Sequence, residues 1–212
     1  MKLPKPATAQ AEKGERPRRG TPGQTRARIV MAAARAFQDE GYFGTDSNVI
    51  ARSAGYAPGT FYKHFVDKRE AFLAVYADWV TAQWAEIAKV LESDVGEARL
   101  APQLIDQLLE HHRLWRVFRG SLKALIATDT EVRKAHRTWR RRQLKLLSDL
   151  LGFELSSKDA LELLLGERIA DALADGDSEA LGVPRELARK HLVSTWTGLL
   201  SRRKPKSRRA RG

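Results

Sequence analysis

Between Pro58 and Phe65, a short run of residues carries side chains that could bind an anionic polymer. Phe61 and Phe65 lie four residues apart, so on a helix they form one apolar stripe that can be buried. The polar residues that this stripe leaves facing outward are Thr60, Tyr62, Lys63 and His64. Their hydroxyl, ammonium and imidazole groups are suited to phosphate oxygens and base edges. The run is therefore a candidate DNA-contacting helix.

The preceding residues predict a second short helix that would hold this one in place. The segment 47–54 has one apolar face, made of Ile50, Ala51 and Ala54. Gly55 follows, where a chain that leaves a helix often needs a positive φ. Pro58 suits the first turn of a new helix, because its missing N–H has no intrahelical partner there. Two helices joined by a tight glycine turn make a helix-turn-helix.

The spacing of these residues resembles the signature of TetR-family transcriptional regulators. The residues that carry the resemblance are Ile50-Ala51, Ala54-Gly55, Gly59-Thr60-Phe61-Tyr62, His64-Phe65 and Lys68. The segment 26–44 resembles the first helix and connecting turn of that family, so the match covers about residues 25–72. The resemblance implies that Tyr62 and Lys68 contact DNA phosphates, with Thr45 as a further candidate. Its candidates for the major-groove face are Arg52, Thr60, Lys63 and His64.

Three residues depart from the family pattern. Asp46 stands where the family often has Thr or Ser; it is a good N-cap, but it cannot donate to a phosphate. Ala57 stands where Ser usually caps the recognition helix, a loss of about 1 kcal/mol. Tyr56 replaces a small aliphatic residue. These departures leave the fold prediction intact and bear on the individual DNA contacts.

The basic charge of the chain is concentrated at its two ends. The net charge is +12; residues 1–28 hold eight Lys and Arg and two Glu, and residues 201–212 hold seven basic residues and no acidic one. The segment between them is close to neutral. Both ends are predicted to be disordered and able to bind phosphates. A non-specific basic DNA-coating protein that uses these ends is therefore an alternative to a sequence-selective regulator.

The sequence offers little for catalysis. No histidine follows a glutamate by three residues, and the metal, phosphate and nucleophile motifs His-Glu-x-x-His, P-loop and Gly-x-Ser-x-Gly do not occur. Adjacent histidines such as His111 and His112 diverge by about 100° on a helix, which makes a poor metal pair. We therefore expect no enzyme activity, cofactor or metal. With no cysteine, secretory signal or long apolar segment, we expect a cytoplasmic protein.

The periodicity predicts an all-α fold of about nine helices in four regions. These are a basic arm (1–20), a DNA-binding domain (21–66), a ligand-binding and dimerisation domain (67–200) and a basic tail (201–212). Capping boxes begin helices at Thr21 and Ser156, and Asp67 begins a long helix to about residue 92. The other predicted helices span 98–118, 121–127, 130–151 and 184–200, with Gly120 as a break. The predicted core line of the helix after Ser156 is Leu161, Leu164, Leu165, Ala172 and Leu173.

Aromatic and histidine side chains gather in the predicted central helices, which favours an apolar pocket with a few polar groups. The candidate ligand-binding residues are Trp79, His111, Trp115, Phe118, His136 and Trp139. The alternative is that each of them is ordinary core. Because the resemblance implies a ligand-binding domain here, we prefer a pocket for a small hydrophobic or aromatic effector.

Small residues form two ridges that would let helices approach closely. The first consists of Gly166, Ala170 and Ala174, and the second of Ser194 and Gly198. The ridges could pack within one chain or across a two-fold axis, and the resemblance favours a homodimer. A dimer would present two recognition helices and select a near-palindromic site. Together these observations predict a repressor that a small-molecule effector releases from DNA; a regulator without an effector remains an alternative.

Overall fold

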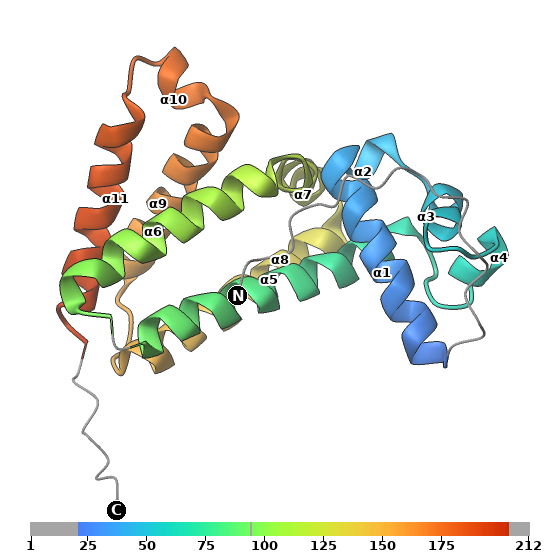
Figure 1. Cartoon of the computed structure of the whole chain (residues 1–212), viewed down its shortest axis with the longest axis horizontal. Helices are drawn as coiled ribbons and strands as arrows, with labels where there is room; N and C mark the ends of the chain where they lie inside the picture. The colour runs from blue at the N-terminus through green and yellow to red at the C-terminus, as the bar shows by residue number, and fades with distance from the viewer. Residues whose placement is uncertain (1–20, 94, 204–212) are drawn as a thin grey trace, which may run out of the picture. The chain divides into compact units, whose positions relative to one another are not determined.

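The computed structural model describes residues 21–93 and 95–203, and within these ranges the chain forms eleven α-helices, as the all-α prediction requires. Their bounds are α1 Pro22–Asp39, α2 Gly41–Gly44, α3 Ser47–Ser53, α4 Pro58–Phe61, α5 Lys68–Glu92, α6 Glu97–Leu114, α7 Arg116–Thr128, α8 Thr130–Leu151, α9 Ser157–Asp175, α10 Asp177–Ala180 and α11 Arg185–Leu200 (Figure 1). None of these helices is long and apolar enough to cross a membrane. The predicted basic arm and most of the basic tail lie outside the described residues.

The helices group into two compact units. The first contains the described residues up to Val80 together with 117–133, and the second contains 81–116 and the described residues from Lys134 onward. The division expected at 66/67 therefore falls later along α5. Residues 117–133, expected in the ligand-binding domain, pack with the first unit. Both α5 and α8 contribute residues to both units.

The first unit is built on α1, which begins as the sequence predicts. Thr21 and Gln24 form a reciprocal capping box, and Pro22 occupies the first turn. Ile29, Ala33 and Phe37 are fully buried along one face of the helix. Gly41 then takes a φ of +73°, a conformation that side chains with a Cβ adopt only with strain, and this turn leads into α2.

The helix-turn-helix forms at the predicted place. Asp46 caps α3, because its Oδ1 accepts from the N–H groups of Asn48 and Val49 at 2.7 and 2.8 Å. Gly55 has a φ of +83°, which turns the chain toward α4. The regular part of α4 ends at Phe61, four residues before the predicted end. The N–H of His64 bonds to the carbonyl of Phe61 three residues back, so the chain continues as tighter turns.

An aromatic cluster joins α1, α2, α5 and α7 within the first unit. The Phe72 ring stacks on Phe118 with centroids 4.6 Å apart, and it meets Phe37 edge-on at 5.2 Å. Tyr42 packs against Phe72 at 5.3 Å and Trp79 against Phe118 at 5.7 Å. Burial of large rings in offset and edge-on contacts stabilises the packing of α7 on the start of α5.

The predicted helix break at Gly120 is wrong. The chain leaves helical geometry at Trp115, and Gly120 lies inside α7. A glycine inside a helix costs only about 1 kcal/mol, and burial of Phe118, Leu122 and Leu125 along α7 offsets it. The short helices α2 and α10 were not predicted, because four residues carry no measurable periodicity.

In the second unit, α6, α9 and α11 lie side by side (Figure 1). One buried cluster joins α6, α9 and α11 through Ile105, Ala170 and Leu192, and another includes Leu104, Leu147 and Leu199. A buried pair also links α6 to α9, because His112 Nδ1 lies 2.9 Å from Asp171 Oδ1. The capping box of α9 at Ser156 and Asp159 forms as predicted.

Some residues of α9 that were predicted to be buried in the core are exposed. Leu161, Leu164 and Leu165 are 53%, 47% and 46% exposed, whereas Leu173 is buried. The reason lies in the rotation of α9, which turns Gly166 and Ala170 toward the rest of the unit.

Candidate nucleic-acid interface and internal pocket

The outward side of α4 and the turn after it present polar side chains that make no hydrogen bond to other described residues. Arg52, Tyr62 and Lys63 are exposed, and Thr60 and His64 are half-buried. In the described part of the chain, none of these five side chains makes a hydrogen bond. The Tyr62 ring meets the buried ring of Phe61 edge-on at 5.4 Å, and the residue is 56% exposed. The predicted DNA-contacting residues of this segment are therefore accessible donors on a fixed scaffold.

Lys68 was expected to contact a phosphate, but in this structure its ammonium forms hydrogen bonds within the protein. It donates to the carbonyl oxygens of Tyr42 and Thr45 at 2.6 and 2.7 Å. It also lies 4.2 Å from the centroid of the Tyr42 ring. Burial lowers the pKa of this ammonium, which the negative charge of Asp46 partly opposes. The phosphate contact of Lys68 stays a prediction.

Thr45 is not on the surface. The residue is 6% exposed, and its Oγ1 is buried without a hydrogen-bond partner among the described residues. A phosphate contact from this hydroxyl would require the α2–α3 connection to move. In this structure the Thr45 hydroxyl is therefore not accessible to a phosphate, and its contact with DNA stays a prediction.

Two arginines of α1 border the same surface and were missed by sequence reasoning. The Arg26 guanidinium lies 4.8 Å from the centroid of the Phe65 ring, and an Arg28 nitrogen lies 3.5 Å from the Tyr56 hydroxyl. Hydrogen bonding to Thr25, followed by Arg28, lowers the pKa of that phenol. Both arginines are exposed, so they add positive charge beside the helix-turn-helix. Only their place in the fold reveals this, because an arginine on a helix start carries no distinctive pattern.

Contacts with α7 and the start of α8 hold the α1–α2 turn and α5 in the first unit. The Tyr42 N–H donates to Ser121 Oγ at 2.8 Å. A Cβ added to Gly41 would lie 2.9 Å from that same oxygen, so only glycine fits here without a shift. Arg69 reaches Asp67 at 3.2 Å and Asp129 at 3.4 Å. These contacts make α7 part of the scaffold of the first unit.

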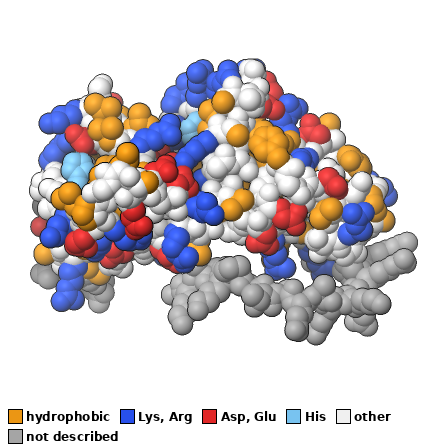
Figure 2. Space-filling model, turned by 90° about the horizontal axis from the view of Figure 1, so that it is seen from above, with side chains coloured by type: hydrophobic (Ala, Val, Ile, Leu, Met, Phe, Trp, Pro, Cys, Tyr) orange, Lys and Arg blue, Asp and Glu red, His pale blue; other side chains and the backbone are white. Residues whose placement is uncertain are grey.

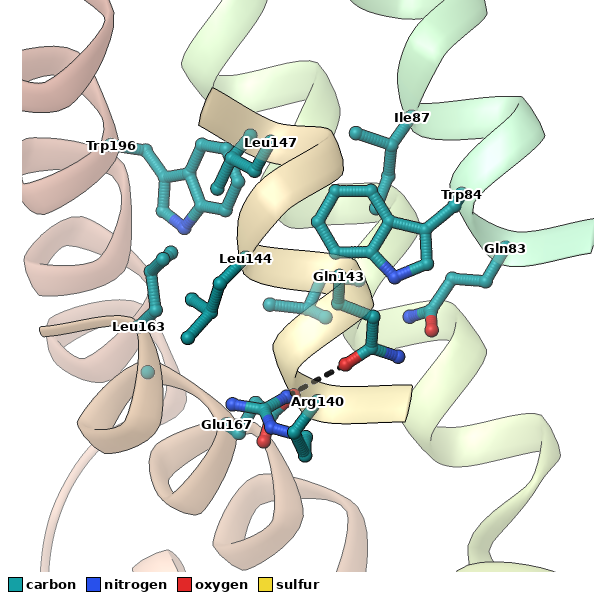
Figure 3. Close-up of a pocket in the computed structure, with 12 residues that line it drawn as sticks. Gln83, Trp84, Ile87, Arg140, Gln143, Leu144, Leu147, Leu163, Glu167 and Trp196 are labelled. Carbon is teal, nitrogen blue, oxygen red and sulfur yellow. Dashed lines mark hydrogen bonds and ion pairs between the residues drawn. The ribbon is translucent and has the colours of Figure 1, made fainter. Parts of the chain in front are cut away.

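A pocket of about 60 Å³ lies within the second unit (Figure 3). It is lined by Gln83, Trp84, Ile87, Leu108, Arg140, Gln143, Leu144, Leu147, Leu163, Gly166, Glu167 and Trp196. An ion pair between Arg140 and Glu167 closes one end, and Arg140 also donates to Gln143 Oε1 at 3.2 Å. The pocket is thus apolar along its walls and polar at one end.

The six predicted ligand-binding residues do not line this pocket. Trp79 and Phe118 belong to the aromatic cluster of the first unit. The other four, His111, Trp115, His136 and Trp139, belong to the second unit. There the ring centroids of His111 and Trp115 lie 6.3 Å apart. The Arg142 guanidinium lies 5.2 Å from the centroid of the Trp139 ring. Trp84 and Trp196 are the tryptophans of this pocket. In the described residues, no group of three or more His, Asp or Glu could hold a metal ion.

The two small-residue ridges have different surroundings. Gly166 and Ala170 are buried, and a Cβ on Gly166 would lie 3.5 Å from Leu192, so this ridge packs α9 on α11 within one chain. Ala174 is half-buried, whereas Ser194 and Gly198 are exposed. Figure 2 shows hydrophobic side chains reaching the surface among charged ones. The exposed large hydrophobic residues of α9 and α11 are Leu161, Leu164, Leu165 and Leu187.

The chain is similar to a known protein family and to several characterised proteins. Residues 29–75 match the family model of bacterial regulatory proteins of the tetR family. The chain is 23% identical over 123 residues to the fatty acid metabolism regulator protein of Bacillus subtilis, covering 58% of this chain and 60% of that protein. It is 34% identical over 80 residues to the regulator AcrR of Shigella flexneri, covering 38% of this chain and 32% of that protein. These matches therefore span less than two thirds of the relatives' lengths.

Solved structures match over most of the chain. A transcriptional regulator from Rhodococcus sp. Rha1 superposes with a TM-score of 0.63 at 22% identity, covering 86% of this chain and 97% of that one. The fatty acid degradation regulator FadR from Bacillus halodurans has a TM-score of 0.58 at 17% identity, covering 87% of this chain and 97% of that one. At these identities the likeness shows a shared fold.

Proposed function

We propose that this chain, which belongs to the TetR family of bacterial regulatory proteins, is a sequence-specific DNA-binding transcriptional regulator. The observation that carries the proposal is the accessible face of α4 and the turn after it. Tyr62 and Lys63 are exposed there and make no hydrogen bond within the described chain. A short helix that presents such donors on a buried aromatic base is suited to the major groove.

The exposed leucines of α9 support a homodimer. Leu161, Leu164 and Leu165 are each close to half exposed, although long apolar side chains usually lose water contact in a folded protein. Contiguous exposed apolar surface commonly marks an interaction site. A second copy that covers the same stripe through a two-fold axis would bury it and would present two copies of α4 to one DNA. Such a dimer selects a near-palindromic operator.

A small-molecule effector would act by shifting an equilibrium between forms that bind DNA well and poorly. It releases the DNA only if it binds the poorly binding form more tightly, and the coupling is reciprocal. A coupling of about 1–3 kcal/mol would change operator affinity by roughly 5–150-fold. Because α5 and α8 contribute residues to both compact units, they are the candidate links. Two similar proteins are named for fatty acid metabolism or degradation, which favours metabolic genes as targets.

The proposal is tested by selecting binding sites for the full chain from random DNA at near-physiological salt. We expect enrichment of an inverted repeat. The variant Lys63→Ala should lose affinity for that site, whereas Lys190→Ala, which removes an exposed lysine of α11, should not. Binding without a preferred sequence, unchanged by Lys63→Ala and lost steeply as salt rises, would instead support the non-specific coating protein.

A further inference from the structure

The walls of the second-unit pocket are suited to a flat apolar body. Figure 3 shows Trp196 and Trp84 on either side of Leu144 and Leu147, with Ile87 beside Trp84. The two indole rings come from α11 and α5, and the leucines come from α8. The volume of about 60 Å³ matches on the order of four to six water positions, which limits an occupant to about one ring in this form.

The lining of the pocket carries several donors that no described residue engages. Gln143 is only 8% exposed; its Oε1 accepts from Arg140, and its amide N–H groups donate to no described residue. The amide of Gln83 and the indole N–H groups of Trp84 and Trp196 likewise donate to no described residue. The one carboxylate of the lining, Glu167, is already paired with Arg140. Donors that no described residue engages can bond to a ligand, so the pocket is suited to one that supplies acceptor oxygens.

The ion pair explains how a charged ligand could enter without leaving a buried charge unpaired. The side chains of Arg140 and Glu167 are 22% and 33% exposed, so Glu167 can turn into solvent when another anion takes its place. Arg140 is the only cation of the lining, and it would receive the incoming anion in the bidentate manner typical of a guanidinium. A cationic ligand would instead meet the charge of Arg140.

We propose that this pocket binds an aromatic monocarboxylate, with the ring against Leu144 and Leu147, flanked by Trp84 and Trp196, and the carboxylate on Gln143 and Arg140 in place of Glu167. The inference deepens the proposed function, because it names the chemical class of the effector. It assigns Gln143 as the head-group donor that selects acceptor oxygens. It also assigns Glu167 as an internal competitor for Arg140 in the empty pocket.

The test uses three probes of similar size and different charge: benzoate, benzamide and benzylammonium. The full chain, labelled with ¹⁵N, reports through its five indole N–H signals, which Trp84→Phe and Trp196→Phe assign. We expect benzoate to shift the Trp84 and Trp196 signals and to bind at least tenfold more tightly than benzylammonium, with benzamide between them. Equal or tighter binding of benzylammonium, or shifts confined to other tryptophans, would overturn the proposal.

Two variants of the pocket and one matched control separate recognition from structural support. Glu167→Gln removes the competing charge at nearly constant shape, so benzoate affinity should rise severalfold. The matched change Glu162→Gln on the same helix, outside the pocket lining, should leave it unchanged. Gln143→Leu should reduce the preference for benzoate over benzylammonium. A Glu167→Gln variant that folds normally and binds benzoate more weakly would contradict the exchange.

The two proposals fail separately. Selection of an inverted repeat without benzoate binding would support the proposed regulator function and contradict the proposed carboxylate ligand. Benzoate binding by a chain that shows no preferred DNA sequence would support the proposed ligand site and contradict the proposed regulator function.

Discussion

Lys68, the first residue of α5, donates from its ammonium to the backbone carbonyl of Thr45 at 2.7 Å. A second donation, to Tyr42, spans 2.6 Å. Together they tie the end of α2 and the approach to α3 to the start of α5. A cation at these carbonyls supplies partners for groups that the short helix α2 leaves unsatisfied. Lys68 therefore fixes the turn on which the helix-turn-helix is mounted.

Lys68→Met should destabilise the first unit by about 1–3 kcal/mol, because two carbonyls lose a charged donor. Affinity for all DNA sequences should fall in parallel, since the turn before α3 loosens. Denaturant unfolding and DNA titration across a salt series measure the two effects. Lys63→Met is the matched control; its exposed ammonium makes no hydrogen bond within the described chain. It should preserve stability and lower affinity most for the preferred sequence. Unchanged stability in Lys68→Met, with a salt slope reduced by about one, would identify Lys68 as a direct phosphate ligand instead.

Gly59 in α4 has open space where a Cβ would stand. Gly59→Ala should therefore raise stability by roughly 0.5–1 kcal/mol, as alanine does in a helix. If the backbone of α4 approaches DNA closely at this point, the same methyl should lower operator affinity. Gly120→Ala in α7 meets equally open space and should stabilise without affecting DNA binding. Thermal unfolding measures the change in stability, and DNA titration measures the change in operator affinity. Full operator affinity in Gly59→Ala would indicate that Gly59 does not approach the DNA.

Local signals were the part of this fold that the sequence could predict. The capping boxes at Thr21 and Ser156 and the positive φ at Gly55 depend on neighbouring residues alone, and the structure contains all of them. The position of the helix-turn-helix follows from the same kind of information. By contrast, the exposure of Leu164 depends on how α9 is rotated against α6 and α11, which no local pattern encodes.

The pocket shows the same limit. Trp79 and Trp84 lie on the same helix, five residues apart, yet Trp79 packs on Phe118 in the first unit and Trp84 lines the pocket in the second. Periodicity places both on an apolar arc and cannot tell which neighbour each one meets. Trp196, on α11, was not a candidate because it stands outside the predicted central helices. Only the packing of α11 brings it to the pocket wall.

Asp159 gives the chain a defined acid sensitivity. Its Oδ1 accepts from Arg202 at 2.5 Å, and this bond, with those from Ser156, lowers the pKa of the carboxyl from 3.8 to about 2. A carboxyl with a lowered pKa in the folded state stabilises that state above its unfolded pKa, and the contribution is lost as pH falls toward the folded one. Because Arg202 is partly exposed, we expect a contribution on the order of 1 kcal/mol.

Asp159→Asn should therefore be less stable than the parent chain at pH 7, and the difference should shrink between pH 4 and pH 2. Urea unfolding at a series of pH values measures it. Asp149→Asn, which removes an exposed carboxylate paired with Lys145 in α8, serves as the control and should show a much smaller difference. A difference for Asp159→Asn that stays constant down to pH 2 would assign the stabilisation to the cap geometry and not to the charge.

Leu164→Glu tests the dimer proposed for the exposed stripe of α9. Leu164 is 47% exposed in the single chain, so a glutamate there should be tolerated by the monomer fold. In a two-fold interface the same change would place two carboxylates in apolar surroundings, where desolvation strongly disfavours their charge. We expect a dimer-to-monomer shift by analytical ultracentrifugation, together with a large loss of affinity for an inverted repeat.

The control is Leu181→Glu, which introduces the same charge at a leucine that is 80% exposed after α10. It should leave both the mass in solution and the operator affinity unchanged. An unaltered dimer in Leu164→Glu would move the interface away from this stripe. Retained affinity for a full inverted repeat in a monomeric Leu164→Glu would separate dimerisation from operator choice. In the proposed dimer each α4 would read one half-site, so we expect the monomer to bind single half-sites about as weakly as full ones.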